Sequence, residues 1–429
     1  MFIRSEVVRA WRRMLLAACL TGGAAVAQAQ MCKEDVRVLA QERDGLALLE
    51  KHKDEFKARS GASFKVDTAL NENDRRTRTR ADASGAGRYH VYYVDEANVA
   101  LFAQSKWITP LLKYYPAEYD YADFDPGRQK VAAYAGETWF APLTGGGDLL
   151  VYRKDLLEKA GIAPPATLDE FVAAARKLHD PAKGIYGVAL RGQRGSGANV
   201  WRWMPYFRGL GGQWFEGGKP VFNSPAAVKA TQTYLELFKY SPPSTKTGGW
   251  DESTDAFLMG KVAMLIESTP LAGYAHDPKK SLLVINKVAY APPPTPLTGG
   301  GYGHGLAIGA KANKSEEARQ CAGLFIAWAT SKVQEQRRLA EGQFGELNRS
   351  SVLASPEFAR RYGVDLGKAL ADTGKRTAVN FWQDPAWPDL GDRWGVILEE
   401  LINGSRTDIQ GGLNELEAYA KQLLDKRGR

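Results

Sequence analysis

The segment GETWFAPLTGGGDLLVYRKDLLEKAG, residues 136–161, is the most informative part of the chain for its architecture. Its second half predicts a buried strand over residues 149–152 and a helix over residues 154–160, which Gly161 ends. A strand that runs directly into a helix is the repeating unit of α/β proteins, so we expect this segment to belong to an α/β sheet.

The same pattern occurs on the N-terminal side of this segment. Alternating apolar residues at 36–40 and 64–66, with a helical stretch between them, predict a β-α-β unit, and a strand over residues 89–94 follows. The sheet is therefore expected to be substantially parallel. Ligands bind beyond the carboxyl ends of such strands, which singles out four residues that could equally serve as helix caps or solvated surface groups: Glu42, Arg43, Asp44 and Asp95.

The C-terminal side repeats this architecture. Thr167 and Glu170 form a capping box for a helix over residues 168–178, and Pro225 stands at a first helical position. A strand is expected over residues 262–267, and helices over residues 316–328 and 413–423. A chain of 429 residues is too long for one ordinary core, so two lobes are expected.

The N-terminus has the organisation of a secretory signal. Four arginines within residues 4–13 precede an apolar run over residues 14–26 and the small-residue site Ala27-Gln28-Ala29, which predicts cleavage after residue 29. Removal of residues 1–29 lowers the net charge from +8 to +5, so we expect a periplasmic protein with no nucleic-acid partner. The alternative is a lipid anchor at Cys19, although the apolar run before it is short.

Motifs for catalysis and metal binding are missing from the sequence. There is no P-loop, H-E-x-x-H or G-x-G-x-x-G motif, and the five histidines are dispersed, so we expect no cofactor, no metal site and no catalytic residues. Cleavage would leave Cys32 and Cys321. An oxidising compartment permits a bridge between them, and the sequence leaves that bridge open.

Aromatic residues in glycine-rich segments give the clearest functional signal. They include Trp201, Trp203 and Trp250, and further along the chain Tyr302, Trp382 and Trp387. A single tryptophan is more often a core residue. Several of them beside Asp, Glu, Arg and Asn suit a carbohydrate site, because flat rings cover C–H faces and planar polar groups bind hydroxyls.

The chain resembles extracellular solute-binding protein family 1 of ABC importers, the maltose-binding-protein-like group. The similar segments are residues 136–161, 256–264, 303–330 and 401–424. The resemblance implies an α/β clamshell of type II, in which two interleaved lobes are joined by a hinge of several strands. It places the N-terminal lobe at residues 30–142 and 288–348, and the C-terminal lobe at residues 143–287 and 349–429.

The resemblance also implies a function. The protein would be a monomeric, non-enzymatic receptor that captures a sugar, short oligosaccharide or sugar alcohol and delivers it to a membrane permease. Arg349 could bind ligand or brace the hinge. The expected ligand-binding residues are Glu42, Arg43, Asp44, Asp95, Thr144, Trp201, Trp250, Glu267, Ser268, Tyr302, His304 and Arg349.

Two other functions stay open at this point. An exported carbohydrate-active enzyme, a hydrolase or lyase, would need two carboxylates facing each other across the cleft. A receptor for an anionic solute could use a set of arginines whose simpler explanation is a solvated basic surface, namely Arg43, Arg153, Arg191, Arg194 and Arg202.

Overall fold

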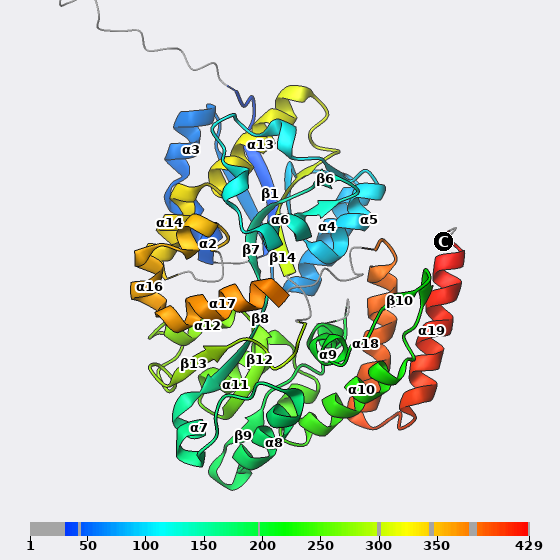
Figure 1. Cartoon of the computed structure of the whole chain (residues 1–429). Coiled ribbons are helices and arrows are strands. Elements are labelled where there is room, and N and C mark those ends of the chain that lie inside the picture. Colours follow the sequence, from blue (N-terminus) through cyan, green and yellow to red (C-terminus); the bar gives the residue numbers. More distant parts are fainter. Residues whose placement is uncertain are drawn as a thin grey trace, which may run out of the picture.

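The computed structural model describes residues 31–41, 44–195, 198–297, 302–342, 347–376 and 384–427. Two α/β lobes, each built around its own sheet, lie one above the other in Figure 1. Within the described residues, no helix is both long enough and apolar enough to cross a membrane.

The first lobe contains a six-stranded sheet in the order β2-β1-β3-β14-β4, with β7 also paired to β14. Three strands are parallel, as expected, and β14 runs antiparallel to β3, β4 and β7. The strands are β1 (Val36–Gln41), β2 (Phe64–Ala69), β3 (Val91–Asp95), β4 (Ile108–Thr109), β7 (Ala141–Gly146) and β14 (Tyr302–Gly309); β5 (Ala133–Tyr134) and β6 (Glu137–Thr138) form a separate pair.

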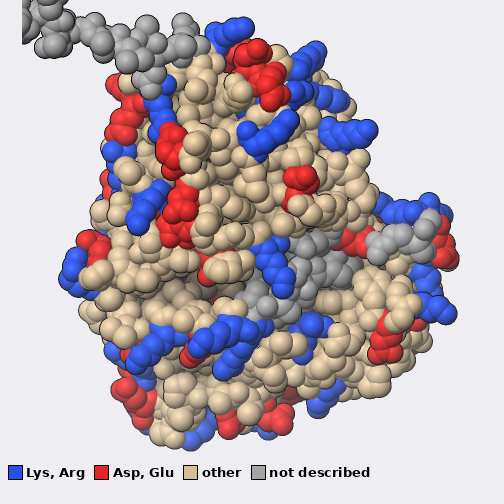
Figure 2. Space-filling view, turned by 45° about the horizontal axis from the view of Figure 1, so that its top comes forward, with Lys and Arg blue, Asp and Glu red and all other residues tan. Residues whose placement is uncertain are grey.

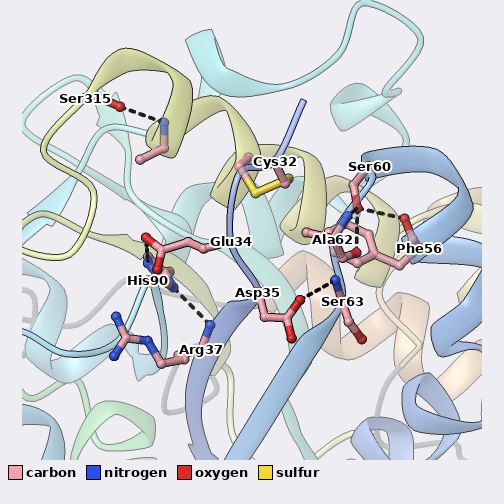
Figure 3. The surroundings of a disulfide bond; sticks show 12 residues. Cys32, Glu34, Asp35, Arg37, Phe56, Ser60, Ala62, Ser63, His90 and Ser315 are labelled. Carbon is pink, nitrogen blue, oxygen red and sulfur yellow. Dashed lines mark hydrogen bonds and ion pairs between the residues drawn. A yellow bond between two sulfur atoms is a disulfide. The ribbon is translucent and has the colours of Figure 1, made fainter. Parts of the chain in front are cut away.

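Helices cover this sheet and close an aromatic core. Phe56, Phe64 and Phe325 pack with ring centroids 5.1–6.0 Å apart. A disulfide joins Cys32, just before β1, to Cys321 on α13, and it lies at the edge of this core (Figure 3). The helices are α2 (Asp44–Lys51), α3 (Lys53–Ser60), α4 (Glu72–Ser84), α5 (Glu96–Gln104), α6 (Pro126–Ala132), α13 (Glu316–Ala329) and α14 (Lys332–Glu341), with 3-10 turns at Leu112–Tyr114 and Tyr121–Asp123.

The second lobe contains a four-stranded sheet in the order β13-β8-β12-β9. Only β9 and β12 are parallel, so this sheet differs from the first, whereas the sequence suggested the same architecture twice. The strands are β8 (Asp148–Arg153), β9 (Tyr186–Val188), β12 (Val262–Ser268) and β13 (Val288–Ala291), with a small pair of β10 (Phe215–Glu216) and β11 (Lys219–Pro220).

Eleven described helices surround the second sheet, and the expected capping box of Thr167 and Glu170 opens α8. They are α7 (Lys154–Ala160), α8 (Leu168–Leu178), α9 (Ala198–Gly209), α10 (Pro225–Phe238), α11 (Trp250–Leu258), α12 (Pro270–His276), α15 (Ser350–Leu353), α16 (Pro356–Tyr362), α17 (Val364–Arg376), α18 (Trp387–Asn403) and α19 (Ile409–Asp425), with 3-10 turns at Pro181–Lys183 and Pro243–Lys246.

The chain passes between the lobes at places that differ slightly from the expected ones. Strand β7 stays paired with β14 as far as Gly146, so residues 143–146 lie in the first sheet. Strand β13 pairs with β8, with Val288 opposite Arg153, and so residues 288–291 lie in the second sheet and not in the first. The last crossing lies close to the boundary drawn between residues 348 and 349, because Arg349 bridges Phe124 while Val352 packs into the second core.

Candidate ligand-binding site

A cavity lies between the two lobes and encloses about 1360 Å³ of empty space, including solvent at its mouth. It sits beyond the carboxyl ends of β1 and β12, where α/β sheets bind their ligands. The first lobe contributes Gln41, Asn71, Glu72, Asn73, Arg76, Thr144 and His304. The second lobe contributes Arg191, Gln193, Ala198, Trp201, Arg202, Gly249, Trp250, Asp251, Glu252, Ser268 and Pro270.

The first turn of α4 forms the first lobe's wall, and Asp95 fixes it in place. Asn71 caps the helix by accepting from the N–H of Asp74. The carboxylate of Asp95, at the end of β3, accepts from Arg75 Nη2 at 2.7 Å and from Arg76 Nε at 2.8 Å. Its other oxygen caps α5 through the N–H of Asn98. Asp95 therefore aims Arg76 at the cavity without lining it.

These partners keep Asp95 in its charged form. The side chain is fully buried, and burial by itself raises the pKa of a carboxyl. The guanidinium groups of Arg76 and Arg75 outweigh burial and hold the pKa of Asp95 well below its ordinary value. Arg76 also pairs with Glu72 at 3.1 Å. The first wall therefore presents two buried arginines matched by two carboxylates.

The second wall repeats this arrangement with different elements. Arg191 donates to both carboxylate oxygens of Glu267 on β12, one of them at 2.9 Å. Arg202 on α9 lies 2.8 Å from Asp148 and 3.4 Å from Glu267. Burial raises the pKa of Glu267, but Arg191 and Arg202 outweigh it, so this pKa is lowered. Glu267 therefore positions the arginines from behind the cavity surface.

Two tryptophans of the second lobe supply the aromatic surface. Trp250 begins α11, and its Nε1 donates to Ser268 Oγ at 3.1 Å, which fixes the plane of the ring. Trp201 lies on α9, and the guanidinium carbon of Arg76 is 5.9 Å from its ring centre. This cation–π contact spans the cleft. Trp203 and Trp387 are instead buried in the second lobe's core.

The expected site residues fall into four groups. Thr144, Trp201, Trp250, Ser268 and His304 line the cavity. Asp95 and Glu267 lie behind it, as described above. The third group lies outside what the structure describes. Glu42 and Arg43 are outside it entirely. Asp44 begins α2 and Tyr302 begins β14, but their side chains are outside it.

Arg349 forms the fourth group and is placed away from the cavity. Its guanidinium donates to the carbonyl oxygens of Asp120 at 2.7 Å and Thr330 at 3.0 Å. It also lies 4.4 Å from the ring centre of Phe124. All three partners belong to the first lobe, so Arg349 braces the last crossing and is absent from the cavity lining among the described residues.

The first turn of α4 is the part of the site that the sequence analysis missed. It provides Asn71, Glu72, Asn73 and Arg76 to the cavity. The helix is polar over most of its surface, and so it lacks the apolar periodicity by which helices are predicted. The capping pattern of Asn71 and Asp74 directly after a strand was the available signal.

The described residues of the cavity form no preformed metal site. In the parts of the chain that the structure describes, no group of three His, Cys, Asp or Glu side chains is placed to hold a metal ion. The polar groups that line the cavity are amides, hydroxyls, the arginines with their carboxylate partners, His304, and the carboxylates of Asp251 and Glu252. They are suited to hydrogen bonding with a solute.

Two α/β lobes with a polar and aromatic cavity between them define a clamshell receptor of the periplasmic-binding-protein type. The chain belongs to the bacterial extracellular solute-binding protein family, whose model matches residues 41–336. This confirms the resemblance found in the sequence and the expected type II fold.

Relatives with known ligands are similar over most of the chain. The mannitol-binding protein of Pseudomonas aeruginosa is 30% identical over 82% of this chain and 85% of its own length. A solute-binding protein of an ABC transporter from Agrobacterium radiobacter K84, solved with ribitol, has a TM-score of 0.82 and 28% identity, covering 92% and 99% of the two chains. One from Agrobacterium vitis S4 with bound D-mannitol has a TM-score of 0.80 and 26% identity, with the same coverage.

Proposed function

We propose that this protein is a periplasmic receptor that binds a sugar alcohol, or a related neutral sugar, between its lobes and delivers it to the permease of an ABC importer. The solutes bound by its relatives support this class of ligand: mannitol, ribitol and, for a protein of Mycolicibacterium smegmatis, erythritol or L-threitol. The proposed ligand class also includes sugars and short oligosaccharides.

The pairing of every buried arginine at the two described walls with a carboxylate is the observation that carries this proposal. Four buried arginines at the two walls face four carboxylates: Arg75, Arg76, Arg191 and Arg202 against Glu72, Asp95, Asp148 and Glu267. An anionic solute would require a cation without such a partner. A neutral polyhydroxylated ligand needs none, because its hydroxyls both accept from guanidinium N–H groups and donate to carboxylates. The pairing therefore disfavours the anionic alternative.

The remaining lining residues fit this ligand. Trp201 and Trp250 offer flat faces for the C–H groups of a carbon chain or ring. Asn73 and Gln193, from opposite lobes, offer amides that donate and accept. A polyol that bridges both sets would hold the lobes together. Binding would therefore favour the closed arrangement.

Calorimetric titration with D-mannitol, ribitol and a phosphate ester of mannitol tests the proposal. We expect saturable binding of a neutral polyol with little dependence on salt, because no net charge is neutralised. The ester should bind far more weakly, since its phosphate finds no free cation. Tighter binding of the ester, weakened by salt, would contradict the neutral-ligand proposal.

Variants then locate the site. Trp201→Ala and Trp250→Ala should each weaken polyol binding about tenfold or more through lost stacking area. Trp107→Ala is the matched control, because Trp107 packs on Phe102 in the first lobe and does not line the cavity. Equal affinities in all three variants would place the ligand elsewhere.

Export, assembly and the absence of turnover belong to the same proposal. Cleavage of residues 1–29 should give the mature form, which mass spectrometry of the exported protein measures. Light scattering should show a monomer with and without polyol. A polyol or oligosaccharide incubated with the protein should be recovered unchanged, whereas a new product would favour the carbohydrate-active enzyme.

A further inference from the structure

Exposed apolar side chains gather at one place on the second lobe. Leu282 and Leu283, on the loop between α12 and β13, are 76% and 59% exposed, and Met259 at the end of α11 is 53% exposed. Gly260 brings the two segments together, because a Cβ placed on it would lie 3.7 Å from that of Leu283. We call Met259, Leu282 and Leu283 the apolar tip. Clustered exposure of this kind marks an interaction surface.

Lysines surround the apolar tip. Lys287 Nζ donates to the carbonyl oxygen of Leu283 at 3.1 Å, and the N–H of Lys154 donates to the carbonyl oxygen of Lys287 at 2.9 Å. Lys261 follows Gly260 directly. The full exposed set is Lys154, Lys261, Lys279, Lys280 and Lys287.

Most of these lysines form no ion pair with a carboxylate in the described part of the chain. Some surface lysines elsewhere pair with carboxylates, as Lys421 does with Glu417 at 2.7 Å, and basic and acidic side chains lie beside one another on much of the face shown in Figure 2. Among the described residues, no ion pair involves Lys154, Lys261, Lys279 or Lys287. Two carboxylates lie among them: Asp155 pairs with Arg153 at 2.6 Å and is also close enough to Lys287 to feel its charge, and Asp277 accepts from the backbone N–H of Lys279 at 2.8 Å. The lysines outnumber these two carboxylates.

The apolar tip lies at the end of the second lobe that points away from the cavity. Ser268 ends β12 at the cavity, whereas Met259 and Gly260 precede the other end of that strand. A strand of this length separates the two by about 20 Å. In Figure 1, β13, α7 and α11 accordingly lie below the region where the lobes meet. The surface can therefore be occupied while the cavity stays open to solute.

We propose that the apolar tip and its lysines bind the surface of an anionic phospholipid bilayer. The two leucines would enter the boundary between headgroups and acyl chains, and the ammonium groups would pair with lipid phosphates. The apolar stems of the lysines add to the contact while their charged ends stay at the interface. The contact is reversible and holds the receptor near the membrane in which a permease would lie.

Vesicle co-sedimentation of the whole protein tests this proposal. The probes are vesicles of phosphatidylcholine mixed with phosphatidylglycerol, and vesicles of phosphatidylcholine alone. We expect binding to the anionic vesicles only, weakened by salt. Leu282→Ser with Leu283→Ser should reduce the bound fraction at least about tenfold. Lys154→Gln with Lys261→Gln should reduce it about fivefold for each lysine removed.

A matched control tests whether vesicle binding requires this surface or only some exposed apolar residue beside a lysine. Val333 and Lys332, at the start of α14 on the first lobe, are likewise an exposed apolar and basic pair. Val333→Ser with Lys332→Gln should leave vesicle binding unchanged. Thermal midpoints establish that every variant is folded.

Three results would overturn the proposal. They are equal binding to both kinds of vesicle, full binding by the leucine variant, and a self-association of the wild type that the leucine variant abolishes. The last result would assign the apolar tip to a second copy of the chain. None of them bears on polyol binding, which is measured separately.

Discussion

Asp95 shows how one side chain can shape a binding cleft without touching the ligand. It ends β3, caps α5 and holds Arg75 and Arg76 in the first wall. One carboxylate oxygen accepts from both arginines, and the other accepts from the N–H of Asn98. A change at this position therefore affects two helices and the cavity together.

Asp95→Asn should destabilise the protein strongly. The amide removes the charge that compensates two buried guanidinium groups, and loss of one partner in such a buried network costs about 3–5 kcal/mol. Urea unfolding measures this loss. Asp372→Asn is the control, because Asp372 forms an exposed pair with Lys375, where a change should stay within about 0.5 kcal/mol. Similar losses in both variants would contradict the role given to Asp95.

The loss of stability in acid should also depend on Asp95. The pKa of Asp95 is lower in the folded protein than its ordinary value of 3.8, so its contribution is fully present above pH 3.8 and is lost as the pH falls below it. The wild type should lose stability over that range faster than Asp95→Asn does. Unfolding curves at a series of acidic pH values measure the difference, and parallel losses would refute it.

At the scale of elements, α14 controls the last crossing between the lobes. Glu335 on this helix accepts from the backbone N–H groups of Asn348 and Arg349. The side chain of Asn348 in turn donates to the carbonyl oxygen of Leu143 on β7 at 2.7 Å, which ties the last crossing to the first. Two connections of the hinge are therefore linked through one buried carboxyl.

Glu335→Gln should change how stability depends on pH. Burial raises the pKa of Glu335 to about 7. Two backbone N–H groups and the nearby Arg338 and Arg349 lower this pKa, but they do not outweigh burial. A carboxyl with a raised pKa stabilises the fold below its ordinary value of 4.5, and this contribution is lost as the pH rises to about 7. The wild type should therefore lose stability relative to Glu335→Gln over that range.

Chemical unfolding of both proteins between these pH values measures that slope. Glu341→Gln provides the control, because Glu341 forms an exposed pair with Lys51. A wild type that gains stability with pH relative to Glu335→Gln would show that Glu335 is charged throughout.

Most elements could be predicted from sequence, because they carry local signals. The capping box at Thr167, the proline at position 225 and the apolar periodicity of α13 gave helices near their observed bounds. The first turn of α4 was missed since it buries arginines against Asp95, a partner about 20 residues away. No local pattern records such a pairing.

The lining of the candidate cavity could be predicted only in part, because side-chain directions depend on contacts that are distant in sequence. Trp201 and Trp250 stood out by composition, and both line the cavity. Arg349 was expected either to bind ligand or to brace the hinge, and its guanidinium turns to the carbonyl oxygens of Asp120 and Thr330. Position along the chain indicates the lobe of a residue, whereas the direction of its side chain depends on tertiary contacts.

At the scale of the whole molecule, the two lobes are interleaved: the part of the second lobe from β8 to β13 is inserted into the first lobe, and the rest of it follows α14. The chain leaves the first sheet after β7 and returns to it with β14. The disulfide between Cys32 and Cys321 joins two ends of the first lobe that are 289 residues apart in sequence, so the closed loop contains most of the second lobe. The bridge itself lies in the first lobe, beside the contact of Asp35 with Ser63 (Figure 3).

Replacing both cysteines by serine should therefore lower stability but spare ligand binding. A crosslink that closes so long a loop restricts the unfolded chain, and its loss costs about 2–5 kcal/mol. The cavity residues lie in other parts of the lobes, so polyol affinity at a temperature well below the unfolding midpoint should stay within about twofold of the wild type. Calorimetric unfolding and polyol titration of the same preparation measure both quantities. Weakened binding by a stably folded double variant would instead mean that the bridge sets the arrangement of the first wall, through β1 and its neighbour β3.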